Sequence, residues 1–97
     1  MALDNVNVLG RDYSVEFVPD LGDNYGECEH EGASIEIVAG LDDHLRREII
    51  LHEVMHAILR QQGRQYSAKE EEFVTALACG LIPVLDSNPK LRKALRC

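Results

Sequence analysis

Short segments within the first forty residues alternate between apolar and polar side chains, a pattern typical of β-strands that bury one face. Residues 6–8 and 13–18 predict one hairpin, and residues 27–30 and 34–38 predict a second. The inward positions of these strands are apolar: Tyr13, Val15, Phe17, Ile35 and Ile37. The sequence therefore predicts a small antiparallel β-sheet of two hairpins, with one face available for packing against a helix.

The apolar pattern becomes helical after residue 44. Between residues 45 and 60, apolar side chains and two histidines recur at steps of three and four residues, and the middle of the segment is apolar on almost every side. Asp42 or Asp43 can cap the start of this helix, and Gly63 can end it. We therefore predict a long helix that other elements enclose.

A second helix is predicted to begin at Ser67, which has the spacing of a capping box with Glu70. Its apolar residues recur at helical steps: Phe73, Val74, Leu77, Leu81 and Val84. Pro83 is expected to kink this helix or to mark its final turn. Residues 90–96 predict a short last helix that turns its leucines toward the body. Together the elements predict a single α+β domain over residues 1–97.

The net charge of −7 is unevenly spread along the chain. Residues 1–44 carry eleven acids and a single base, which does not suit nucleic-acid binding. No stretch is apolar and long enough to predict a membrane span, and the N-terminal stretch lacks the layout of a signal peptide. The three cysteines, Cys28, Cys79 and Cys97, are an odd number without pairwise spacing, so we expect a reducing, cytoplasmic setting.

The motif H-E-x-x-H occupies positions 52–56, in the middle of the first predicted helix. Residues four apart share a helix face, so His52 and His56 can offer two imidazole nitrogens to one ion. Zinc binds neutral imidazole at roughly 2.0–2.1 Å, and catalytic zinc sites use three protein ligands and leave one position for water. Glu53 follows the first ligand directly, where its carboxylate can take a proton from that water.

The alternative interpretation is that two core histidines and a glutamate have this spacing by chance. A carboxylate inside the most apolar helix of the chain would be costly to bury alone, because buried charges are normally paired or bound to a metal. The favoured interpretation is therefore a metal site, with Zn²⁺ as the cofactor.

A third protein ligand is expected among Glu70, Glu71 and Glu72, in the first turns of the second predicted helix. Acidic residues are also favoured there by the helix dipole alone. The capping box accounts for Glu70, and Glu72 lies at the margin of the apolar stripe, where it could reach the two histidines. We therefore predict Glu72 as the third ligand and keep Glu71 as the alternative. Asp86 or an acid of the sheet is the next candidate.

The H-E-x-x-H motif, a short loop and the run Glu-Glu-Phe-Val leading into a helix of small and apolar residues resemble the gluzincin zinc peptidases. More narrowly, residues 6–88 resemble the minimal gluzincin-like proteins of phages and other mobile elements. The resemblance implies a zinc site of His52, His56 and a helix glutamate, with Glu53 as the general base. It also implies that substrate lies along an edge strand of the sheet.

Two functions fit this pattern. The first is a zinc-dependent peptidase that acts on a protein or peptide, with Glu53 activating the attacking water. The second is a non-catalytic, zinc-stabilised binding module, in which Glu53 would have no role beside an open coordination position. No nucleic-acid or membrane partner is expected, and the oligomeric state and the substrate stay open. Tyr66 is interpreted as a packing residue, and His30 and His44 as surface histidines.

Overall fold

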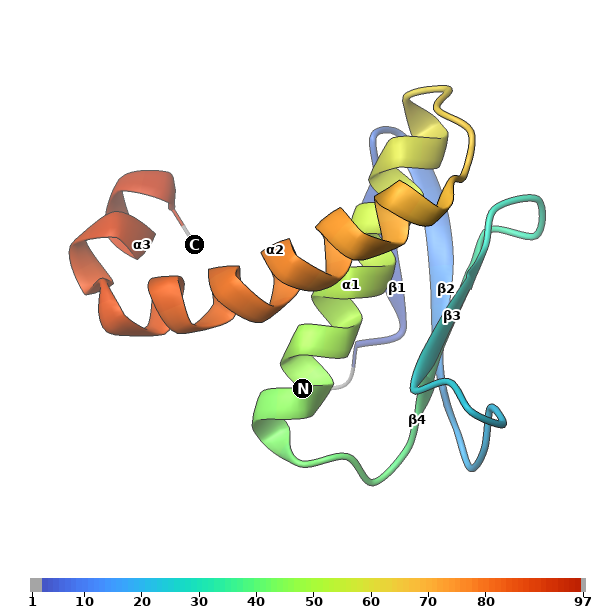
Figure 1. Ribbon diagram of the computed structural model, residues 1–97, viewed down its shortest axis with the longest axis horizontal. Coiled ribbons are helices and arrows are strands. Elements are labelled where there is room, and N and C mark those ends of the chain that lie inside the picture. The colour runs from blue at the N-terminus through green and yellow to red at the C-terminus, as the bar shows by residue number, and fades with distance from the viewer. Residues whose placement is uncertain (1–2, 97) are drawn as a thin grey trace.

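The strands come first along the chain and the helices follow. The computed structural model describes residues 3–96, so Cys97 and the first two residues of the N-terminal stretch lie outside the described part. The elements are β1 (Asn5–Val8), β2 (Arg11–Val18), β3 (Gly26–Glu29), β4 (Ser34–Val38), α1 (Asp43–Gln61), α2 (Ala68–Ser87) and α3 (Pro89–Leu95). Helix α1 lies against the sheet, and α2 crosses α1 and extends beyond it toward α3 (Figure 1). The predicted α+β fold is confirmed.

The sheet is mixed, whereas a purely antiparallel sheet was predicted. Its strand order is β1-β2-β4-β3, and both predicted hairpins are present as antiparallel pairs, β1 with β2 and β3 with β4. Between the hairpins, however, β2 and β4 run parallel, with Val15 opposite Ile35. Strand β4 takes this inner position because its alternate residues Ile35 and Ile37 are fully buried. The more polar β3 is left at the edge.

The core lies between α1 and the inner face of the sheet. Its buried residues are Val8, Tyr13, Val15, Ile35, Ile37 and Ala57. Phe17 departs from the predicted inward set, because its side chain near the end of β2 is 42% exposed. At the β3 edge of the same sheet, the backbone approaches α1 so closely that a Cβ at Gly26 would lie 2.7 Å from Ile49 and 3.0 Å from Glu53. This close approach brings the edge strand next to the centre of α1.

The predicted caps of the first two helices are present. Asp42 accepts a hydrogen bond from the backbone N–H of Leu45 at 2.9 Å and caps α1. Just after α1, Gly63 adopts a φ of +80° and donates its N–H to the carbonyl of Arg60. Ser67 accepts the N–H of Glu70 at 3.3 Å at the start of α2. Both long helices therefore begin and end close to the predicted residues.

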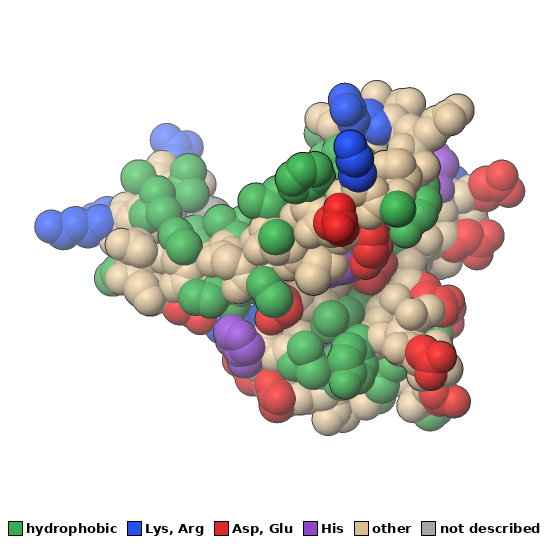
Figure 2. Space-filling view, viewed as in Figure 1, with side chains coloured by type: hydrophobic (Ala, Val, Ile, Leu, Met, Phe, Trp, Pro, Cys, Tyr) green, Lys and Arg blue, Asp and Glu red, His purple; other side chains and the backbone are tan. Residues whose placement is uncertain are grey.

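Helix α2 packs on α1 with a different face from the one that its large apolar residues suggest. The buried residues of α2 are Val74, Ala78 and Ile82. The predicted stripe is largely outside, with Phe73 66% and Leu77 59% exposed. Figure 2 shows hydrophobic side chains on the surface over α2 and α3. None of the helices within residues 3–96 has the length and apolarity needed to cross a membrane.

Candidate metal centre

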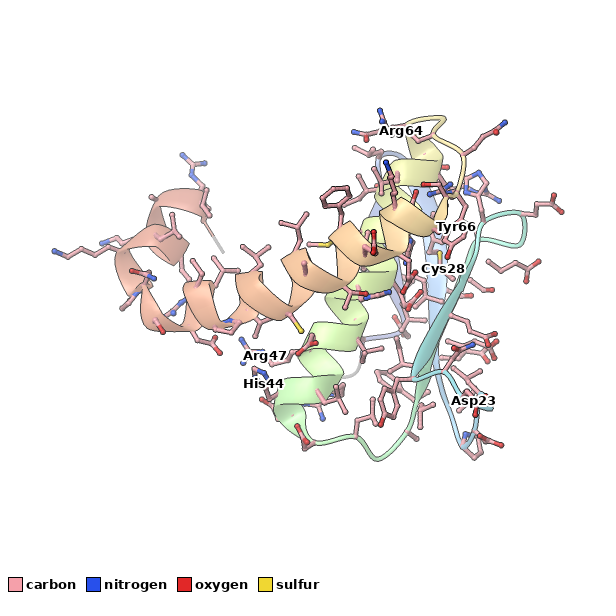
Figure 3. The ribbon with its side chains drawn as sticks, viewed as in Figure 1. Asp23, Cys28, His44, Arg47, Arg64 and Tyr66 are labelled. Carbon is pink, nitrogen blue, oxygen red and sulfur yellow. The ribbon has the colours of Figure 1, made fainter. Side chains whose placement is uncertain are left out.

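The candidate centre lies where the first turn of α2 crosses the middle of α1. The side chains of His52 and His56 are only 14% and 12% exposed. They border a cleft that is closed on the other side by β3 and the loop before it. Figure 3 shows residues along this cleft: Tyr66 from the α1–α2 loop, Cys28 from β3, and Asp23 from the loop before β3.

Three side chains bring their donor atoms together at this crossing. The Nε2 atoms of His52 and His56 are 3.1 Å apart. Oε1 of Glu71 lies 2.9 Å from Nε2 of His52, and Oε2 of Glu71 lies 2.9 Å from Nε2 of His56. Donors bound at roughly 2.0–2.1 Å to one tetrahedral ion lie about 3.3 Å from each other, so small shifts would admit an ion. Two imidazoles and a carboxylate are also a donor set that suits zinc.

Glu71, and not Glu72, meets the two histidines. Glu71 shares a helix face with Val74 and Ala78, three and seven residues later, which pack against α1. Glu72 is exposed and points about 100° further around the helix. The prediction of Glu72 assumed that the stripe containing Phe73 would face α1, and the helix is turned away from that orientation. The structure thus favours Glu71, the alternative ligand, over Glu72.

Within the described part of the chain, Glu53 is the most buried charged residue. It is 6% exposed, and its carboxylate lies 3.9 Å from Nε2 of His52. Burial raises its pKa to about 7, and the opposing charge of His56 only partly offsets this. The carboxylate therefore lies beside the three donors, with a pKa near neutrality in the metal-free protein.

The pKa of His52 is lowered, chiefly because burial disfavours the imidazolium form. Glu71 acts in the opposite direction without reversing the effect. A lowered pKa keeps His52 neutral near pH 7, and only the neutral ring has a nitrogen lone pair available for a metal.

The contacts of the Glu70 carboxylate were not predicted from the sequence. Its backbone N–H is capped by Ser67 as predicted, but its carboxylate does not return to the cap. Instead it lies 2.6 Å from Nδ1 of His56 and forms an ion pair with Arg60. Burial opposes ionisation of Glu70, but the hydrogen bonds from His56 and Arg60 outweigh it and lower its pKa. The opposite charges of Arg60 and Glu70 were the available sequence signal.

Other candidate residues have partners of their own. Asp86, the next candidate ligand, binds Arg47 through both carboxylate oxygens at 2.9 and 2.6 Å. His30 hydrogen-bonds the hydroxyl of the buried Tyr13 at 2.7 Å and also lines the cleft. Tyr66 is 62% exposed, and its ring centre lies 6.1 Å from that of His56.

Comparisons of the chain with family models, with curated proteins and with solved structures find no match. The function must therefore be inferred from the geometry of His52, His56, Glu71 and Glu53.

Proposed function

We propose that the protein is a zinc-dependent peptidase in which His52, His56 and Glu71 hold the metal and Glu53 is the general base. The observation that supports this most strongly is the convergence of three donors beside a buried carboxylate. Their atoms lie within 4.8 Å of one another, at the edge of an open cleft. Three protein ligands leave a position for water or substrate, as catalytic zinc sites require.

Zinc at this site would polarise the carbonyl of the scissile bond and lower the pKa of the attacking water. Glu53 would accept one proton from the attacking water as the hydroxyl oxygen bonds to the carbonyl carbon. The same carboxylate would then pass this proton to the amide nitrogen as the carbon–nitrogen bond breaks. In the metal-free protein burial raises the pKa of Glu53 to about 7, and the charge of a bound zinc ion would lower it again, so that the carboxylate is ionised and ready to accept the proton.

The cleft supports a protein or peptide substrate. Its volume is about 860 Å³, which accommodates several side chains of an extended segment. Strand β3 borders it and lies at the edge of the sheet, where an added strand can pair with backbone groups. We place the substrate along β3 for this reason. The free thiols of Cys28 and Cys79 support the reducing, cytoplasmic setting that is part of the proposal.

The test compares the zinc-loaded protein with Glu53→Gln in cleavage of a peptide library, read by mass spectrometry. The variant is expected to bind zinc as before and to lose hydrolysis by about 10²–10⁴-fold, because it lacks only the base. Glu72→Gln neutralises the exposed carboxylate next to Glu71, so it is the matched control and should cleave normally. Undiminished cleavage by Glu53→Gln would contradict the mechanism. A zinc-loaded wild type without cleavage would favour the non-catalytic binding module.

A further inference from the structure

We infer that Glu70 is a positioning residue for the metal centre, selecting the nitrogen of His56 that faces the ion and holding the first turn of α2 so that Glu71 reaches it. The inference rests on the proposed function only where it concerns metal affinity. Its geometric part concerns a contact between two helices that exists without any ion.

The contact is short, buried and directional. Oε2 of Glu70 lies 2.6 Å from Nδ1 of His56, and the side chains are 8% and 12% exposed. The other carboxylate oxygen of Glu70 is occupied by the guanidinium of Arg60. Arg60 in turn donates to the carbonyl of Arg64 at 2.7 Å, in the loop that leads to α2. The carboxylate is therefore held on both sides by α1.

This contact favours one tautomer of His56. Ionised carboxylates can only accept hydrogen bonds, and Glu71 also lies 2.9 Å from Nε2 of the same ring. The contact with Glu70 is shorter, at 2.6 Å, and more buried, so we expect it to hold the proton of the neutral ring on Nδ1. Nε2 then carries the lone pair, and it is the atom that lies 3.1 Å from His52 and 2.9 Å from Glu71. Histidine ligands of metals commonly donate their other N–H to a carboxylate in this way, which fixes the orientation of the ring.

The same contact also orients the neighbouring glutamate. Glu70 and Glu71 are adjacent, so their side chains point about 100° apart on α2. With Glu70 fixed on Nδ1 of His56, Glu71 is directed to the Nε2 atoms of both histidines. Among the described residues, His52 makes its polar side-chain contacts through Nε2 alone. The two Nε2 atoms face each other at 3.1 Å, and only one of them can hold the proton between them. Loss of Glu70 should therefore alter the tautomer of His56 directly and that of His52 through this contact.

The experiment uses the full chain with ¹⁵N-labelled histidine at pH 8. Tautomers are read by NMR in the metal-free protein, and zinc affinity is read by competition with a chelator. The wild type should show His56 protonated at Nδ1. Glu70→Ala should mix the two tautomers of His56 and weaken zinc binding by about 10–100-fold. Glu72→Ala, the control in the same helical turn, should change neither reading.

Glu70→Gln is the second variant, since it preserves the shape of the side chain should the alanine variant unfold. It should bind zinc several-fold more weakly than the wild type, because a neutral amide is a weaker acceptor and leaves Arg60 without its ion pair. His56 protonated at Nε2 in the wild type, or unchanged zinc affinity in the folded Glu70 variants, would overturn the inference. A wild type that binds no zinc would instead contradict the proposed function, and the tautomer reading would still test the contact.

Discussion

The two sides of helix α2 differ in a way that reverses the usual expectation for apolar and polar residues. On one side, the charged Glu70 is only 8% exposed and contacts His56 and Arg60 of α1. On the other, Phe73 and Leu77 are 66% and 59% exposed. The difference shows that the docking face of α2 follows complementary contacts with α1 and not the largest apolar side chains.

The size and charge of its side chains together explain which face of α2 docks on α1. The buried Ala78 allows the two helices to approach closely, whereas Leu77 at the same place would hold them apart. The surface of α1 at the crossing presents two histidines and Arg60, which match the acids at the start of α2. At the far end, the ion pair between Arg47 and Asp86 joins the same two helices.

Among the polar contacts between α1 and α2, loss of His56 should have the largest effect. His56→Ala deletes a proposed zinc ligand and the partner of Glu70, so zinc affinity should fall by at least about 100-fold. Zinc at a hundred times its dissociation constant stabilises a folded protein by about 2.7 kcal/mol, and the variant should lose this gain. Thermal unfolding with zinc and with a chelator measures both states. A variant that zinc stabilises as strongly as it does the wild type would remove His56 from the site.

The free energy of unfolding of the metal-free protein should depend on pH, and this dependence measures the cost of burying the Glu53 carboxylate without an ion. The pKa of Glu53 is raised from 4.5 to about 7, so the folded protein binds this proton more tightly than the unfolded chain. Stability should therefore fall as pH rises from about 4.5 through 7, by at most ~3 kcal/mol. Burial of His52 lowers its pKa and acts in the opposite sense as the pH falls.

The difference between wild type and Glu53→Gln in chelator isolates the contribution of Glu53. Chemical denaturation across this pH range should give a steeper decline for the wild type than for the variant. Parallel curves would show that Glu53 is ionised or solvated in the metal-free protein.

Two truncations on α2 test which of its apolar residues pack against α1. Val74 is 3% exposed, so Val74→Ala should lower the free energy of unfolding by about 2 kcal/mol. Leu77→Ala removes a larger but exposed side chain and should change it by no more than about 0.5 kcal/mol. Urea denaturation measures both. A larger loss from Leu77→Ala than from Val74→Ala would reverse the assignment of the packing face.

Local sequence signals were sufficient for much of the fold. Alternation predicted both hairpins and the burial of Ile35 and Ile37, and Asp42 and Gly63 marked the ends of α1 as expected. The parallel pairing of β2 with β4 was not predicted, because it depends on which strand takes the inner position, a tertiary choice between two hairpins. Each hairpin is itself compatible with either arrangement.

In the candidate site too, the features set by local sequence were predictable and those set by tertiary packing were not. The spacing of His52 and His56 on one helix is local, so their convergence follows from the sequence. The choice between Glu71 and Glu72 depends on the rotation of α2 against α1, which the exposed Phe73 stripe misrepresents. The cap at Ser67 was visible in the sequence, but the partner of the Glu70 carboxylate lies across the helix pair, fourteen residues away at His56.

Zinc titration of Glu71→Gln and Glu72→Gln beside the wild type tests the central claim most directly. Both variants keep the Ser67 cap and the Glu70 contacts, and they differ only in which carboxylate is neutralised. The account predicts one zinc per chain in the wild type and in Glu72→Gln, and binding at least about 100-fold weaker in Glu71→Gln. Full zinc binding by Glu71→Gln, or a wild type that binds no zinc, would contradict it.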